Sequence, residues 1–157
     1  MTKRKETLAA TTPPGDGQDD IGEINEIVGF HIRLAHGAAY RHFTETFSDL
    51  DLTQKQVSVL WLIGDHPDIA QTDLARRMRM DRATTMAIVN RLQDRKLLVR
   101  GKSASDGRKQ TLNLTPAGAD ILVVAKDAIR AHEAWLKARF TPGEVATLIE
   151  LLTRIHQ

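Results

Sequence analysis

Apolar residues recur every three or four positions through most of the chain after residue 20. This spacing is typical of amphipathic helices, whose apolar stripe faces a core. Residues 1–20 are polar, contain prolines and glycines, and hold few large apolar groups, so we predict a disordered N-terminal tail. The apolar pattern predicts helices at about 21–47, 53–64, 71–78 and 81–95, and two more that begin at Thr115 and Thr141.

Side chains that cap helix starts support these assignments. Thr53 and Thr141 are each followed three residues later by Gln56 and Glu144, the arrangement of a capping box. Prolines follow directly after Thr115 and Thr141, which suits the first position of a helix. Asp81 is of a type that accepts hydrogen bonds from free backbone N–H groups at a helix start.

One region has the pattern of strands instead. Leu97, Leu98 and Val99 form an apolar run, and residues 110–114 alternate between polar and apolar. The segment between them is polar and turn-forming, which predicts a β-hairpin with a long tip. The predicted fold is therefore mainly α, with about six helices and a two-stranded β-wing.

Basic residues concentrate in this part of the chain. Residues 71–110 hold eleven Lys and Arg against four Asp, a net charge of +7, whereas the whole chain carries +2. A basic segment in an otherwise acidic chain indicates a polyanion-binding surface, although a solvated charged surface is the alternative for charge alone. Seven aromatic residues are too few to stack the bases of single strands, and the absence of cysteine excludes disulfides and thiolate sites.

The order of the elements in the basic segment suits double-stranded DNA. A helix fits the major groove, where base edges are distinguishable, and a preceding short helix crosses the phosphate backbone. An arginine on a neighbouring hairpin can enter a narrow minor groove. We therefore predict that the second short helix and the hairpin bind duplex DNA.

The residues of this region resemble the winged helix-turn-helix of the MarR family of transcription regulators. That resemblance implies an obligate homodimer that binds near-palindromic operators, with repression as the default. It divides a MarR-type domain (21–157) into a DNA-binding module (53–114) and dimerisation helices (21–47 and 115–157). The matching pieces are Gln71–Ala75, Asn90–Leu92, Leu97–Arg100, Asp106–Arg108 and Leu114–Gly118.

The resemblance also implies which residues contact DNA. Thr84 and Met86 would meet thymine methyl groups, Asn90 would meet adenine, and Arg108, held by Asp106, would enter the minor groove. Many relatives carry Thr-Arg where this chain has Met-Ala, so one base-reading arginine is missing here. The predicted DNA-binding set is Gln71, Thr72, Arg82, Thr84, Met86, Ala87, Asn90, Arg91, Asp106, Arg108 and Lys109.

MarR relatives commonly release DNA when a small ligand binds beside the dimerisation helices. Arg33, His36 and Tyr40 are spaced so that they share one face of the first helix. With Trp61 nearby, such a face suits a small-molecule effector that is an aromatic carboxylate or its coenzyme A thioester. The alternative is a polar stripe at the dimer surface.

Other classes of function fit less well. His31, His36 and His42 are five and six residues apart rather than four, which disfavours a metal-responsive regulator. A non-specific architectural DNA-binding protein shares the basic segment, and only sequence preference at moderate salt separates it from a regulator. No phosphate loop, nucleophile elbow or paired-carboxylate motif occurs, so we expect no catalysis and no cofactor. No apolar run is long enough to span a membrane, and we expect a cytoplasmic protein.

Overall fold

The computed structural model describes residues 22–103, 107 and 109–157. The chain divides into two compact units, residues 1–36 and residues 37–157. Among the described residues, no helix has both the length and the apolar character needed to cross a membrane.

The first unit contains a short 3-10 helix, η1 (Gly22–Glu26), and the beginning of α1 (Val28–Thr46). The sequence pattern predicted one continuous helix here, but a break at Ile27 separates the two segments. His31 bonds through Nε2 to the backbone oxygen of Asn25 at 2.6 Å. Large apolar side chains of this unit remain exposed and have no cover within the unit: Ile24, Ile27, Val28, Ile32 and Leu34.

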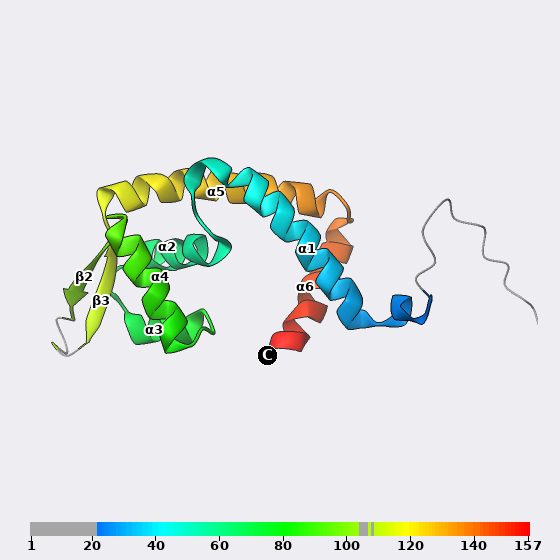
Figure 1. Cartoon of the computed structure of the whole chain (residues 1–157), viewed down its shortest axis with the longest axis horizontal. Helices are drawn as coiled ribbons and strands as arrows, with labels where there is room; N and C mark the ends of the chain where they lie inside the picture. The colour runs from blue at the N-terminus through cyan, green and yellow to red at the C-terminus, as the bar shows by residue number, and fades with distance from the viewer. Residues whose placement is uncertain (1–21, 104–106, 108) are drawn as a thin grey trace, which may run out of the picture. The chain divides into compact units, whose positions relative to one another are not determined.

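The second unit confirms the predicted helices and hairpin. Figure 1 shows α3 and α4 beside the β2–β3 hairpin, with α5 starting where β3 ends. After α1 the elements are η2 (Ser48–Leu50), α2 (Gln54–Asp65), β1 (Ile69–Ala70), α3 (Gln71–Arg77), α4 (Arg82–Asp94), β2 (Leu98–Lys102), β3 (Gln110–Leu114), α5 (Pro116–Lys137) and α6 (Pro142–His156).

The sheet has one strand more than the predicted two-stranded wing. Its order is β1-β3-β2, and both pairings are antiparallel. β1 has only two residues, too few to show an alternating pattern in the sequence. The side chain of Asn113 stabilises the turn before β1. Its Oδ1 accepts from the Asp68 N–H at 2.9 Å, and its Nδ2 donates to the Asp68 carboxylate at 2.7 Å.

The predicted helix caps are present. The Gln56 N–H donates to the Thr53 hydroxyl at 3.2 Å, and the Thr53 N–H donates to the Gln56 amide oxygen at 2.9 Å. Thr141 and Glu144 make the same reciprocal pair at the start of α6. Such caps satisfy backbone donors that have no partner within the helix, so local sequence alone sets where these helices begin.

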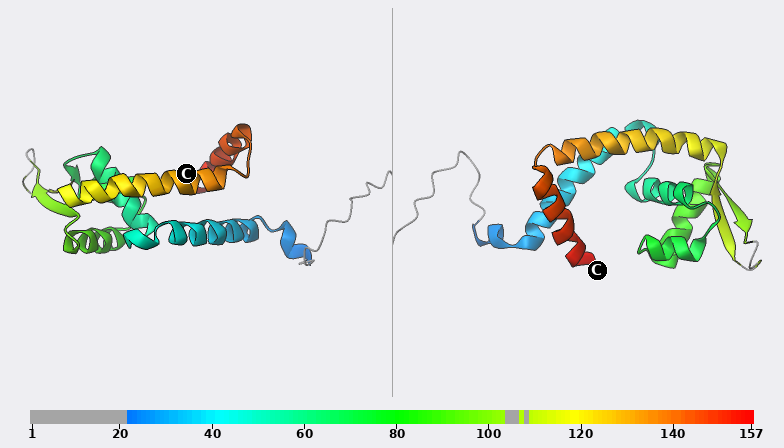
Figure 2. Two further views of the ribbon diagram at one scale, coloured as in Figure 1. Left: turned by 90° about the horizontal axis from the view of Figure 1, so that it is seen from above. Right: turned by 180° about the vertical axis from the view of Figure 1, so that it is seen from behind.

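A hydrophobic core joins α2, α3 and α4 to the sheet. Thr85, Val89 and Leu92 are buried on the inner side of α4, three or four residues apart, and Ile88 is half-buried. Both views in Figure 2 show the two long strands at the outer end of this group of helices. The largest fully buried side chains include Leu60, Ile63, Leu74, Leu92, Leu98 and Leu112.

Aromatic side chains and a histidine pair join the end of α1 to α5. The Nδ1 atoms of His42 and His132 lie 2.8 Å apart, so one donates a hydrogen bond to the other. The His42 ring stacks on Trp135 with centroids 4.0 Å apart, and Phe43 stacks on Phe47 at the same distance. Burial, followed by the charge of His42, lowers the pKa of His132, while Glu133 opposes this effect.

The terminal helix α6 has no buried residue in the single chain. Its apolar residues Ile149, Leu152 and Ile155 are 58%, 43% and 64% exposed. A capped helix with such an apolar face needs a partner surface to cover it.

The first turn of α5 approaches the backbone of Leu97 so closely that only glycine fits at position 118. A Cβ there would overlap the Leu97 carbonyl oxygen and lie 2.8 Å from the carbonyl carbon. We expect Gly118→Ala to lower the free energy of unfolding by about 3 kcal/mol, in the range of overpacking changes in cores. Chemical denaturation followed by circular dichroism measures the change. Gly143→Ala is the control, because a Cβ there meets nothing within 4 Å; equal stability of the two variants would contradict the close approach.

The His42–His132 pair predicts a dependence of stability on pH. Since the folded pKa of His132 lies below its ordinary value near 6.5, the unfolded chain binds more protons just below that pH. The stabilisation is therefore complete above about pH 6.5 and is lost as the pH falls towards the folded pKa. We expect His132→Gln to flatten the decline in unfolding free energy between about pH 7 and 5. His66→Gln, which changes an exposed histidine, should keep the wild-type decline; an unchanged slope in His132→Gln would refute this.

Candidate nucleic-acid interface

Asp81 caps the N-terminus of α4. Its Oδ1 accepts from the Thr84 N–H at 2.8 Å, and its Oδ2 accepts from the Thr84 hydroxyl at 2.6 Å. These bonds lower the pKa of Asp81, with the hydroxyl bond as the largest cause. The buried Thr85 hydroxyl donates to the Asp81 backbone oxygen at 2.9 Å. The cap therefore sets both the start of α4 and the side of the helix that faces the core.

Several residues predicted to read DNA lie on the exposed side of α4. Arg82, Met86 and Asn90 are exposed and four residues apart, so they follow one face of the helix. Ala87 is exposed beside them. The Thr84 hydroxyl donates to the cap, which leaves its methyl group and its oxygen, as an acceptor, for contact with a base.

A polar hollow joins α3, α4 and β3. It has a volume of about 380 Å³ and brings together four of the predicted DNA-binding residues. Two of them are cationic, and the buried Gln71 Oε1 has no hydrogen-bond partner among the described residues. The two cationic side chains, Arg82 and Lys109, suit a phosphate group, whereas the Gln71 oxygen can only accept a hydrogen bond. It is lined by Ala70, Gln71, Thr72, Arg82, Thr85, Lys109 and Gln110.

The hairpin is described up to the base of its tip. The Ser103 N–H donates to the Lys109 backbone oxygen at 3.0 Å, and the lysines at 102 and 109 are exposed. The predicted wing residues Asp106 and Arg108 lie outside the described residues.

Arg100 is a functional candidate to which the sequence patterns assigned no role. Its Nη2 donates to Asn90 Oδ1 at 2.6 Å, and its Nη1 donates to Gln93 Oε1. The hairpin is thereby bonded to the exposed side of α4. The only signal in the sequence was that Asn90 and Arg100 belong to two pieces of the same family pattern.

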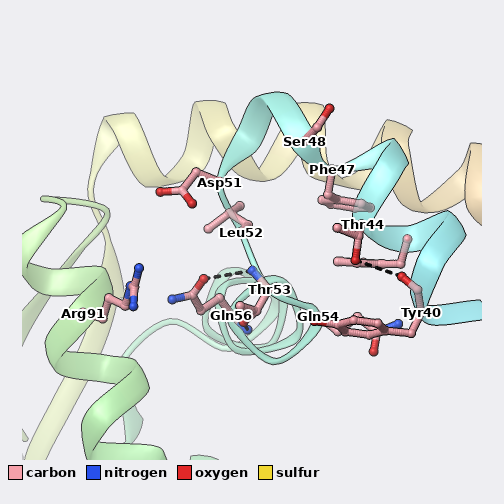
Figure 3. A pocket seen from close by; sticks show the side chains of 11 residues that line it. Tyr40, Thr44, Phe47, Ser48, Asp51, Leu52, Thr53, Gln54, Gln56 and Arg91 are labelled. Atoms are coloured by element: carbon pink, nitrogen blue, oxygen red, sulfur yellow. Dashed lines mark hydrogen bonds between the residues drawn. The ribbon is translucent and has the colours of Figure 1, made fainter. Parts of the chain in front are cut away.

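Arg91 is exposed on another side of α4 from the row Arg82, Met86 and Asn90, and it lines a cavity of about 260 Å³ (Figure 3). Figure 3 shows Arg91 at one end of the row of lining side chains and Tyr40 at the other. Within the described part of the chain, the Arg91 guanidinium makes no hydrogen bond or ion pair. The other lining residues come from the end of α1, the following turn and the start of α2: Phe43, Thr44, Phe47, Ser48, Asp51, Leu52, Thr53, Gln54 and Gln56.

The four predicted effector residues are not gathered in one described cavity. Tyr40 lines the cavity with Arg91, whereas Trp61 lies about two turns further along α2 in a separate shallow hollow. There the ammonium group of Lys126 lies 4.6 Å from the centre of the Trp61 ring. Arg33 and His36 belong to the first unit, where the Arg33 guanidinium lies 5.1 Å from the centre of the Phe30 ring.

Metal ligands are not clustered in the described residues. Among residues 22–103, 107 and 109–157, no group of three or more His, Asp or Glu side chains could hold a metal ion.

Comparison with known proteins gives consistent matches. The sequence pattern that defines the MarR family matches residues 50–109. A putative transcriptional regulatory protein for the hcr operon of Thauera aromatica is 33% identical over 137 residues, which cover 87% of this chain and 82% of the relative. The homoprotocatechuate degradative operon repressor of Escherichia coli is 27% identical over 118 residues, covering 75% and 80% of the two chains.

Solved structures of one repressor also match. The transcriptional repressor CouR bound to a 23-mer DNA duplex superposes with a TM-score of 0.82 at 29% identity and covers 90% of this chain and 100% of CouR. CouR bound to p-coumaroyl-CoA gives a TM-score of 0.79 at 27% identity, with coverage of 89% and 99%.

The polar hollow predicts a measurable contribution of Arg82 to DNA binding. We expect Arg82→Ala to weaken binding to duplex DNA about tenfold, because a cation facing a phosphate is lost. The slope of log affinity against log salt should fall by about 0.9 for each phosphate contact removed. Fluorescence anisotropy at several salt concentrations measures both quantities. Arg130→Ala removes an exposed arginine that pairs with Asp127 on α5 and should change neither; an unchanged slope in Arg82→Ala would remove this residue from the interface.

Proposed function

Because this chain belongs to the MarR family of DNA-binding transcriptional regulators, we propose that it is a homodimeric repressor that an aromatic acid effector releases from its operator. The operator is read by α4 and the hairpin, and the effector is an aromatic carboxylate or its coenzyme A thioester. The observation that carries the DNA-binding role is the exposed row Arg82, Met86 and Asn90 beside the polar hollow. The protein acts where bacterial DNA is found, in the cytoplasm.

The DNA-binding residues divide by chemistry. Gln71, Thr72, Arg82 and Lys109 surround the hollow and are suited to hold a phosphate, which fixes the position of α4 on the duplex. Met86, Ala87 and Asn90 are exposed on α4 and are suited to base edges in the major groove. In this proposal the DNA-binding module is residues 53–114.

Unpartnered apolar faces support the homodimer. In the first unit such a face lies on η1 and α1, and in the second unit it lies on α6. Both faces fall within the segments predicted to form the dimer, 21–47 and 115–157. Two copies that share these faces place two α4 helices on one duplex. Half-sites about 34 Å apart, one turn of DNA, would then be read together.

The cavity beside Arg91 is suited to the effector. Phe43 and Phe47 give it an apolar wall, and Tyr40, Thr53 and Gln56 add hydrogen-bonding groups. A carboxylate would find the guanidinium of Arg91 without a competing partner among the described residues, and arginine binds carboxylates through two parallel hydrogen bonds. The complex of CouR with p-coumaroyl-CoA supports this class of ligand. Arg33, His36 and Trp61 do not line this cavity, and their effector role stays a prediction.

Release follows from the position of Arg91 on α4. A ligand lowers DNA affinity only by the difference between its affinities for the free and DNA-bound states. A carboxylate held by Arg91 bonds directly to the helix that reads DNA. It can therefore favour an orientation of α4 that does not fit two successive major grooves.

The proposal is tested by titrating duplexes from the promoter region beside the gene at about 0.15 M salt. We expect a dimer in solution and an affinity at least 10³-fold higher for one duplex than for unrelated DNA of equal length. A monomer, or equal affinity for all duplexes, would refute the regulatory role and leave an architectural protein.

The effector site predicts a separation between two activities. We expect a set of benzoates, hydroxybenzoates and hydroxycinnamates, free and as coenzyme A thioesters, to contain a compound that releases the operator. Arg91→Gln should weaken the response to that compound at least tenfold, because the carboxylate loses its bidentate partner. Operator affinity without the compound should change less than threefold, because Arg91 lies on another side of α4 from Arg82, Met86 and Asn90. A larger loss would instead support the DNA contact that the family resemblance implies for Arg91. The control is Arg139→Gln on α5, whose arginine lies over the Trp135 ring and should keep the full response.

A further inference from the structure

The bond between the hairpin and α4 is made by one side chain. Arg100 lies in the middle of β2, where it is paired with Leu112 of β3, so its backbone position is set by the sheet. Its guanidinium reaches α4 and donates to Asn90 Oδ1 at 2.6 Å and to Gln93 Oε1. Positions 90 and 93 are one turn apart on α4, which matches the two donor directions of an arginine fork.

This contact decides which groups Asn90 offers to DNA. A side-chain amide has one acceptor oxygen and an NH₂ donor. The oxygen of Asn90 receives a charged donor from Arg100, so the amide plane is oriented with its oxygen towards the hairpin. The NH₂ group then faces away from Arg100 on the exposed side of α4. The paired contact of asparagine with adenine uses the oxygen and the NH₂ together. The oxygen has a second lone pair, so adenine would have to share it with the charged Arg100 donor.

We propose that Arg100 is a positioning residue that holds Asn90 as a hydrogen-bond donor towards the DNA, and that it determines specificity through Asn90 without reading a base itself. The inference rests on the proposed function, because it assumes that α4 reads an operator. Asn90 then reads an acceptor, such as the guanine O6 or N7 or the thymine O4, instead of pairing with adenine. The two hydrogen bonds from the Arg100 guanidinium also fix the orientation of the hairpin relative to α4.

A direct phosphate contact by Arg100 is the competing role, and the two roles differ in what they change. Loss of a phosphate contact lowers affinity for all duplexes equally and reduces the salt slope. Loss of a positioned Asn90 lowers the ratio of operator affinity to affinity for unrelated DNA. The ratio and the slope therefore separate the two roles.

The experiment measures both quantities for Arg100→Lys, Asn90→Ala, the double variant and Lys102→Gln. Arg100→Lys keeps the charge but loses the fork. We expect it to lower the affinity ratio at least tenfold and to leave the salt slope within about 0.3 of wild type. Asn90→Ala should lower the ratio by a similar factor, and the double variant should lose no more than threefold beyond either single variant, because both changes remove one arrangement. Lys102→Gln, an exposed lysine on the same strand, should leave the ratio unchanged.

A further variant keeps the test independent of folding defects. Asn90→Asp changes an exposed side chain that can still accept from Arg100 but presents no donor to DNA. We therefore expect it to lower the ratio of operator affinity to affinity for unrelated DNA as much as Asn90→Ala does. A wild-type ratio in Arg100→Lys or Asn90→Asp, or fully additive losses in the double variant, would overturn the proposal. Thermal melting and solution mass show that each variant is folded and assembled as wild type. If the wild-type protein itself prefers no duplex, the proposed function is refuted. If the wild-type protein prefers one duplex and Arg100→Lys prefers it equally, only the positioning role of Arg100 is refuted.

Discussion

The arrangement of the second unit depends on the close contact between the first turn of α5 and the backbone that leads from α4 into β2. The Thr115 N–H donates to the Leu97 oxygen at 3.1 Å, and the Thr115 hydroxyl donates to the Lys96 oxygen at 2.7 Å. The same hydroxyl accepts from the Gly118 N–H at 2.9 Å, which caps α5. One threonine and one glycine therefore join the start of the long helix to the point where the recognition helix ends and the hairpin begins.

The charges of the basic segment remain available because few of them are neutralised within the chain. Arg76 pairs with Asp73, and Arg95 approaches Asp51 at 4.0 Å, but both pairs are exposed or partly exposed and contribute little stability. The other ion pairs of the described residues lie outside the basic segment: one joins Lys126 of α5 to Asp65 of α2, and the rest lie within α5 and α6. The positive field therefore coincides with α3, α4 and the hairpin, where a polyanion would benefit from it.

In the proposed function, two neighbouring residues of α4 connect DNA reading with effector binding. Asn90 lies on the exposed side and is held by Arg100, while the next residue, Arg91, lines the cavity at the end of α1. Successive residues on a helix point about 100° apart, so one turn of α4 serves both surfaces. A ligand that engages Arg91 acts on the same turn that presents Asn90, and no long path through the protein is required.

The sequence by itself determined the helices, their starts and the hairpin, because these depend on hydrogen bonds and apolar spacing within a few residues. The caps at Thr53, Asp81 and Thr141 are examples. It also indicated DNA as the partner, since charge and element order are properties of the chain itself. Only the tertiary structure showed the third strand and the separation of Tyr40 from Trp61. It alone showed the Arg100–Asn90 bond and the pair of His42 with His132, 90 residues away. Such contacts depend on the direction in which a side chain leaves a packed element, and residues distant in sequence set that direction through the core.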